Sequence, residues 1–273
     1  MHGYVDIKGS FVIKTLYTAF IRKYDSDYNY DGEYHNFWEI VVVLDGEIGV
    51  CAGKDVFLLK KGQAILHEPM EFHRLWSENL TSPTIAIFTF AADNMPKFFS
   101  KIFDVDADEA VNVFKEISDA YNIFAGDVKS IKNIDSLDWQ RAVKDLERYI
   151  LSTVSKKYSH SSVSQSKTAK NYAMAVNILT NNVDKSLSIS EIARLCNMSE
   201  INLKKTFSRY AGVGVMNYFN HLKITAAMNM LEQGMAVSEV SDTLGFSNQN
   251  YFSTVFRRIT GYPPSLHKQK ERH

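Results

Sequence analysis

The feature that most constrains the fold lies in the last fifth of the chain, where two short amphipathic segments meet at Gly245-Phe246. Ser247 and Asn248, both good N-cap residues, precede the second segment, so we expect a helix to begin there. Helical spacing places one apolar group on its buried face: Tyr251, Phe252, Val255, Phe256 and Ile259. Two short helices joined by a tight turn predict a helix-turn-helix, with the second helix as the recognition helix.

The opposite face of this second helix carries short polar side chains followed by two arginines. The residues expected to face DNA are Asn248, Gln249, Asn250, Ser253, Thr254, Arg257 and Arg258. Gln and Asn can hydrogen-bond adenine through two atoms, and Ser or Thr can contact several base edges. The arginines are better suited to phosphate contacts. The pattern therefore predicts double-stranded DNA as a partner.

The same stretch resembles the carboxy-terminal motif of AraC/XylS-type transcription regulators. The matching positions are Lys223, Ala227, Leu231, Val237, Val240, Gly245-Phe246, Tyr251-Phe252, Phe256, Gly261 and Pro264. Agreement over so many fixed intervals is far more specific than a lone short motif. The departures are Lys223 in place of the usual Arg, Ser241 in place of Ala, and His267-Lys268 in place of Tyr-Arg. They affect fine packing and one phosphate contact but not the fold.

The resemblance extends to an earlier unit, from Ser199 to Gly212 with Tyr218. An opening helix is expected over Lys170–Thr180, a second over Glu191–Leu195 with Ser190 as its N-cap, and a first recognition helix over Glu200–Tyr210. That recognition helix would bury Leu203 and Phe207 and expose Ile201, Asn202, Lys204 and Lys205 to DNA. The resemblance implies two helix-turn-helix units joined by a helix from about Val215 to Leu231. Such units could enter successive major grooves about 34 Å apart.

Charge is divided unevenly along the chain, although 31 basic and 31 acidic residues cancel overall. From Thr168 onward there are 12 basic and 7 acidic residues, which leaves 19 and 24 in the first part. A basic part joined to an acidic part fits a nucleic-acid-binding module attached to a module with another task.

The first ninety or so residues predict an antiparallel sandwich or barrel, because short β-branched and aromatic runs alternate with turn residues. The expected strands are Phe11–Tyr17, Phe37–Leu44, Glu47–Ala52, Val56–Leu59, Ala64–His67 and Thr84–Phe90. This part resembles the cupin-like ligand domain of many AraC-type regulators, with landmarks at His35, Glu39, Gly46, Gly62, Pro69 and His73. The predicted fold class is therefore α+β, a cupin-like β-barrel with a helical dimerisation segment followed by an all-α domain.

The histidines of this first part allow two interpretations. Metal-binding cupins usually carry His-x-His in their first motif, whereas Phe37 stands two residues after His35. With one imidazole missing, we expect no metal and no other cofactor. The residues expected to line a small-molecule pocket are instead His35, Trp38, Glu39, His67 and His73. An aromatic wall from Trp38, Phe72 or Trp76 would suit a sugar ring, and local structural roles are the alternative.

Between the two parts, residues 95–158 are expected to be helical. One apolar stripe runs through Val113, Phe114, Ile117, Tyr121 and Phe124, and another through Trp139, Val143, Leu146, Ile150 and Val154. In the family such helices form a dimer contact; the alternative is that they only cover the barrel. The predicted division is 1–94 ligand domain, 95–158 helical segment, 159–167 Ser-rich linker and 168–273 DNA-binding domain.

The remaining signals support an intracellular regulator. Cys51 and Cys196 are too few for a disulfide framework, and the sequence shows no signal peptide or membrane span, so a cytoplasmic location is expected. It also lacks a phosphate loop or nucleophile motif, so no enzyme activity is expected. The leading hypothesis is a dimeric activator of transcription that responds to a small molecule, and RNA polymerase would be a further partner. The alternatives are a cupin metalloenzyme with a DNA-binding tail, and a regulator controlled by partner proteins or abundance.

Overall fold

The computed structural model describes residues 9–121, 137–155, 164 and 166–270, and these fall into two compact units. The first unit consists mainly of residues up to 163, and the second consists mainly of residues from Ser164 onward. Most of the expected linker lies outside the described residues, as does Phe124. None of the helices that the structure describes is long and apolar enough to cross a membrane.

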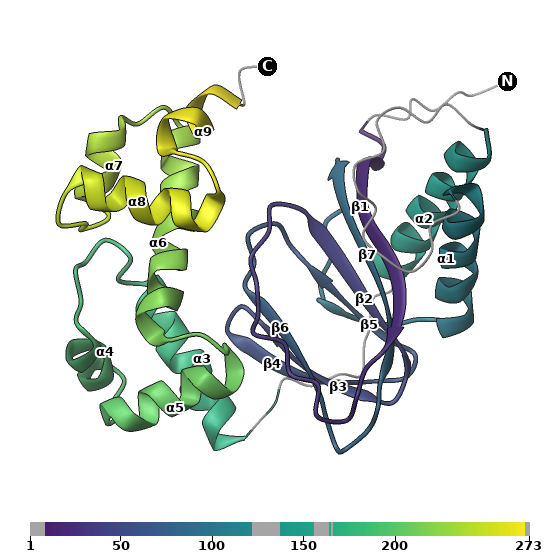
Figure 1. Ribbon diagram of the computed structural model, residues 1–273, viewed down its shortest axis with the longest axis horizontal. Helices are drawn as coiled ribbons and strands as arrows, with labels where there is room; N and C mark the ends of the chain where they lie inside the picture. Colours follow the sequence, from purple (N-terminus) through teal and green to yellow (C-terminus); the bar gives the residue numbers. More distant parts are fainter. Residues whose placement is uncertain (1–8, 122–136, 156–163, 165, 271–273) are drawn as a thin grey trace, which may run out of the picture. The chain divides into compact units, whose positions relative to one another are not determined.

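The described strands of the first unit form two antiparallel sheets (Figure 1). Their bounds are β1 Val12–Lys23, β2 Trp38–Asp45, β3 Glu47–Ala52, β4 Asp55–Lys60, β5 Gln63–His67, β6 His73–Ser77, β7 Thr84–Asp93 and β8 Ile102–Asp104. A five-stranded sheet has the order β1-β7-β2-β5-β8, and a three-stranded sheet has the order β4-β3-β6. The antiparallel β architecture predicted for this part is confirmed.

The position of strand β2 between two cores explains why every residue from Ile40 to Val43 is apolar. All four of these residues are buried, and they alternate between two separate cores. Ile40 and Val42 pack in a core shared with two helices, whereas Val41 and Val43 pack in a core shared with the three-stranded sheet. A strand covered on both faces needs apolar residues at every position.

The two helices of the first unit are α1 (Ala107–Tyr121) and α2 (Leu137–Val154), which lie beside the five-stranded sheet (Figure 1). Their apolar stripes enter the sheet's own core, with Val113 and Ile117 from one and Leu146 and Ile150 from the other. The apolar stripes of both helices are therefore buried against the sheet of the same chain. The expectation of helix across residues 95–158 is wrong at its start, because β8 pairs with β5 there.

In the second unit, α6 (Val215–Glu232) is the central helix (Figure 1). The others are α3 Lys167–Thr180, α4 Ile189–Leu195, α5 Glu200–Tyr210, α7 Val237–Thr243, α8 Gln249–Thr260 and α9 Pro264–Lys270. Helix α6 contacts α3 and α5 toward its start and α7, α8 and α9 farther along, so its buried residues surround the helix. Helix α4 packs instead on α3 and α5. Both expected pairs of helices are present: α4 with α5, and α7 with α8.

The two pairs share the same turn between their helices. Asn197 and Gly245 both adopt positive φ, 51° and 63° respectively. In each turn the next amide donates to a carbonyl five residues back, Met198 to Ala193 and Phe246 to Ser241. Position 245 also requires glycine on steric grounds, because a Cβ there would lie 2.7 Å from a backbone oxygen of Asp184. The second turn is one residue longer, because Ser199 caps α5 and Asn248 caps α8.

Several local predictions need correction in this unit. Helix α4 is capped by Ser188 rather than Ser190, because Ser188 and Glu191 form a reciprocal capping box. Helix α3 begins at Lys167, three residues before the expected start, with Ser166 as its N-cap. Tyr251 is 49% exposed instead of buried, since it occupies the first turn of α8 beside the cap.

Candidate functional site

The first candidate DNA-binding surface is the exposed face of α5. Its buried face holds Leu203 and Phe207, as predicted. Asn202, Lys204 and Lys205 are exposed, and Ile201 is 65% exposed. Lys204 lies 3.6 Å from the Glu200 carboxylate on the preceding turn, so Lys205 is the less restrained cation. This face offers an amide, two ammonium groups and an apolar side chain, which could contact a thymine methyl.

The second candidate surface is the exposed face of α8. Gln249, Asn250, Thr254, Arg257 and Arg258 are all exposed, as the sequence predicted.

Local hydrogen bonds occupy part of this face. The side chain of Asn248 accepts a hydrogen bond of 2.8 Å from the Tyr251 amide, so its oxygen serves the helix cap. Thr254 donates its hydroxyl to the Asn250 carbonyl at 3.0 Å, and its side chain is exposed. Ser253 is only partly exposed.

Aligning α5 and α8 from their N-caps reveals two residues that sequence reasoning missed. Tyr251 occupies the third helical position, which Asn202 occupies in α5, and Arg209 occupies the position of Arg258. Both missed residues are exposed. Counting equal intervals from Ser199 and Asn248 could have found them. The tyrosine hydroxyl and the guanidinium are groups that proteins use to contact phosphates.

A polar cavity of about 280 Å³ lies beside the first recognition helix. It is lined by Thr168, Asn171, Met198, Asn202, Lys205, Thr206 and Arg209. Two cations and two amides thus converge where α3 approaches α5. The phosphate backbone of a duplex carries the charge that such a group attracts.

The residues expected to line a ligand pocket in the first unit separate into two places. Trp38 lines a cavity of about 410 Å³ together with Glu68, Met95, Pro96, Lys97, Phe98 and Phe99. Its ring meets that of Phe98 edge to face at 6.0 Å. The other four residues (His35, Glu39, His67 and His73) are not among the residues lining this cavity. The ring of Trp76 covers Gly49, where a Cβ would lie 2.0 Å from a ring atom.

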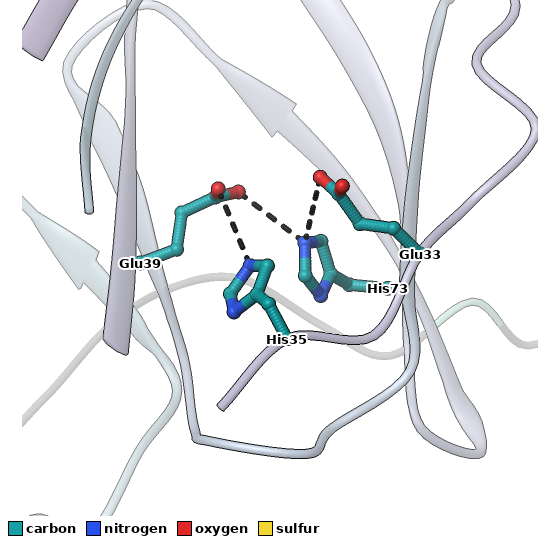
Figure 2. Close-up of side chains that lie close together, drawn as sticks. All are labelled: Glu33, His35, Glu39 and His73. Atoms are coloured by element: carbon teal, nitrogen blue, oxygen red, sulfur yellow. Dashed lines mark ion pairs between the residues drawn. The ribbon is translucent and has the colours of Figure 1, made fainter. Parts of the chain in front are cut away.

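Glu33, His35, Glu39 and His73 form a compact polar cluster, with one ligating atom of each lying within 4.8 Å of the others (Figure 2). Here His35 Nε2 lies 3.6 Å from Glu39 Oε2, and His73 Nε2 lies 3.5 Å from Glu39 Oε1 and 3.6 Å from Glu33 Oε1. His67 stacks on His73 with ring centroids 4.3 Å apart, and its Nδ1 lies 3.6 Å from a Glu71 carboxylate oxygen.

Burial and mutual charge set the protonation of this cluster. Burial alone would raise the pKa of Glu39, but His73, His35 and His67 outweigh it and hold the pKa near 2. Burial would lower the pKa of His73, but the Glu39 and Glu33 carboxylates raise it. For His67, burial and the neighbouring His73 lower the pKa to about 4. At neutral pH Glu39 is therefore a carboxylate and His67 a neutral imidazole.

Glu33 is the member of this cluster that sequence reasoning missed. It stands two residues before His35, whereas the missing imidazole was sought two residues after, at Phe37. The backbone brings it into place, because Glu33 and His73 exchange hydrogen bonds of 2.9 and 3.2 Å between their amides and carbonyls. The signal available in the sequence was a carboxylate and an imidazole in the pattern Glu-x-His.

Two successive helix-turn-helix units around one central helix, each with an exposed polar recognition face, define a bipartite DNA-binding domain. Residues 192–270 match the family model described as a helix-turn-helix domain. The second unit is therefore a helix-turn-helix domain of the AraC type, and the resemblance to AraC/XylS-type regulators predicted from the motifs is confirmed.

Curated relatives match in the same part of the chain. The chain is 31% identical over 91 residues to the HTH-type transcriptional activator RhaR of Salmonella dublin, which covers 33% of this chain and 32% of RhaR. It is 29% identical over 87 residues to the MmsAB operon regulatory protein of Pseudomonas aeruginosa, covering 32% and 28%. It is also 27% identical over 99 residues to the bifunctional transcriptional activator/DNA repair enzyme AdaA of Bacillus subtilis, covering 34% and 47%. The matches thus span less than half the length of these relatives.

Among solved structures, the chain is similar to an AraC-type DNA-binding domain protein from Chromobacterium violaceum, with 24% identity and a TM-score of 0.36. That match covers 37% of this chain and 91% of the other. A match to ToxT from Vibrio cholerae O395 covers 93% of this chain and 97% of ToxT, with 14% identity and a TM-score of 0.39.

Proposed function

We propose that this protein is a sequence-specific transcription regulator whose first unit binds a small molecule that controls DNA binding. The observation that carries the proposal is the pair of helix-turn-helix units, each exposing side chains able to contact bases. Each unit alone would bind modestly. Two units held by one helix bind with a much higher effective concentration, so both are needed for a stable complex.

The Trp38 cavity is the proposed effector site. Its volume of about 410 Å³ lies within the usual range for small-molecule pockets. Trp38 and Phe98 supply aromatic faces, while Glu68 and Lys97 supply charged groups at the same cavity. A carbohydrate is the class we propose first, since a sugar ring can stack on an aromatic face while its hydroxyls bind charged or polar groups.

The effector acts through differential affinity. A ligand shifts an equilibrium between two states only if it binds one of them more tightly. We propose that the effector-bound state favours DNA binding, so the protein acts as an activator in contact with RNA polymerase. We further propose a cytoplasmic homodimer without enzyme activity. Sedimentation of the chain with and without effector tests the dimer, and a monomer in both conditions would contradict it.

The experiment that tests the function is selection of genomic DNA fragments by the purified full chain at a stated salt concentration. We expect enrichment of a two-part motif whose halves lie about one helical turn apart. A variant with Asn202→Ala and Gln249→Ala should lose the enrichment yet retain weak, salt-sensitive binding to any duplex. Equal recovery of all fragments by the unmodified chain, in the presence of candidate sugars as well as without them, would contradict the proposal.

A further inference from the structure

Two imidazoles in the first unit present ring nitrogens to a shared centre. His35 and His73 each donate Nδ1–H to a backbone carbonyl at 3.0 Å, those of Phe37 and Glu71 respectively. A carbonyl oxygen can only accept, so in the neutral ring this contact places the lone pair on Nε2. Both Nε2 atoms are buried, and neither has a hydrogen-bond partner among the described residues.

Distance distinguishes a coordination site from a set of hydrogen bonds. The separations between imidazole nitrogens and carboxylate oxygens are 3.5 to 3.6 Å (Figure 2). A charged hydrogen bond between such groups would be about 2.7–2.9 Å long. Four donors about 2.1 Å from one ion in a tetrahedron would stand about 3.4 Å apart. These three separations are therefore close to those of ligands around a metal ion, and one ligating atom from each of the four residues lies within 4.8 Å of the others.

The carboxylates are oriented for the same centre. Tyr30 donates its hydroxyl to Glu33 Oε2 at 2.9 Å, which leaves Oε1 directed toward His73. Both oxygens of Glu39 face the histidines, Oε1 toward His73 and Oε2 toward His35. Hydrogen bonds from outside the site that fix a ligand's orientation are a regular feature of metal centres.

We propose that Glu33, His35, Glu39 and His73 bind one divalent first-row transition metal ion. Two imidazoles disfavour Ca²⁺ and Mg²⁺, which prefer oxygen donors throughout. With two nitrogen and two oxygen donors and no thiolate, the set suits Zn²⁺, Fe²⁺ or Mn²⁺. This proposal differs from the sequence-based expectation of no metal, because Glu33 adds a fourth donor to His35, Glu39 and His73.

The ligands come from three parts of the first unit. Glu39 lies on β2 of the five-stranded sheet and His73 on β6 of the three-stranded sheet. Glu33 and His35 lie on the segment between β1 and β2. A bound ion would thus join both sheets and fasten this segment to them. The proposal concerns the ion alone and does not depend on the chain being a regulator.

The test uses the full chain without an affinity tag, stripped with a chelator and then titrated with Zn²⁺ and, under nitrogen, with Fe²⁺ or Mn²⁺. We expect one ion per chain by elemental analysis after dialysis. Binding of Co²⁺ as a probe should give visible absorption bands from a site with imidazole and carboxylate donors. An ion content well below one per chain with every metal would overturn the proposal.

Variants identify the ligands. Glu33→Gln and His73→Gln should each weaken metal binding by at least about tenfold and alter the Co²⁺ bands. Asp93→Asn removes an exposed carboxylate of the same unit, 57% accessible and outside both the cluster and the Trp38 cavity, and should bind the metal as the unmodified chain does. If His73→Gln does not fold, Glu33→Gln decides, because Glu33 is 40% accessible and Gln can still accept from Tyr30. Unchanged affinity in Glu33→Gln would overturn the assignment.

Discussion

The amino group of Lys223 donates a hydrogen bond to the carbonyl oxygen of Leu244, the residue that ends α7. The same group donates to the Lys185 carbonyl at 2.7 Å, and the side chain is 4% exposed. Carbonyls at a helix end lack partners within the helix and carry partial negative charge. A buried cation on the central helix therefore stabilises the turn that positions α8.

Replacing Lys223 with Met should destabilise the second unit by about 2–3 kcal/mol, because a buried carbonyl and a partly buried one lose their donor. All three tryptophans, Trp38, Trp76 and Trp139, lie in the first part of the chain. In urea unfolding, the circular dichroism signal should therefore shift to lower urea while the tryptophan fluorescence midpoint stays in place. Lys223→Arg, which keeps a cation and donors, is the control. A shift of both signals together would contradict this local role.

Gln249→Ala should weaken DNA binding selectively at one base pair, by about 1–3 kcal/mol, if the glutamine contacts that base through two atoms. Competition between single-base variants of the selected site measures this preference. The matched control is Gln233→Ala, an exposed glutamine at the end of α6 and outside both recognition helices. An equal loss at every sequence would instead make Gln249 a backbone contact.

Arg258→Ala should weaken binding to all sequences similarly, because we expect this guanidinium to contact phosphate. The slope of log affinity against log salt should fall by about 1. Arg209→Ala should behave alike, since it holds the equivalent position on α5. Titrations at four or more salt concentrations give the slope, and a loss confined to one base pair would show direct base contact.

Stability of the second unit should fall as the pH drops below about 6.5. Burial and the nearby Arg258 lower the pKa of His221 from its usual 6.5 to about 4, so the folded state binds this proton later than the unfolded state does. Stability attributable to His221 is thus present above pH 6.5 and is lost as the pH approaches 4, by roughly 1–3 kcal/mol. Urea unfolding followed by circular dichroism from pH 7.5 to 4 should show a smaller decline in His221→Gln. Parallel declines would contradict the assignment.

Much of this fold could be predicted where a single local pattern dominates. The turn at Gly245-Phe246, the buried pair Leu203 and Phe207, and strand β3 over Glu47–Ala52 all followed from spacing and turn residues. Strands β6 and β8 were missed. The three residues of β8 are strand only because β5 lies beside them, so no local signal marks them.

The polar cluster shows a different limit. His35, Glu39 and His73 could be picked out by residue type, but Glu33 depends on backbone pairing with a strand 40 residues farther along. Residue type could not separate Trp38, which lines a cavity, from Trp76, whose ring covers Gly49. Such assignments depend on which strands become neighbours.

The two recognition helices, matched position by position, present different chemistry. Where α5 offers Ile201 and Asn202, α8 offers Asn250 and Tyr251, and Lys204-Lys205 is matched by Ser253-Thr254. Because the two helices differ, rotating the domain by half a turn on the DNA would not place equivalent side chains in the two grooves. We therefore expect the DNA site of one copy of this chain to have a direction, so that reversing the site in a promoter would also reverse the protein bound to it.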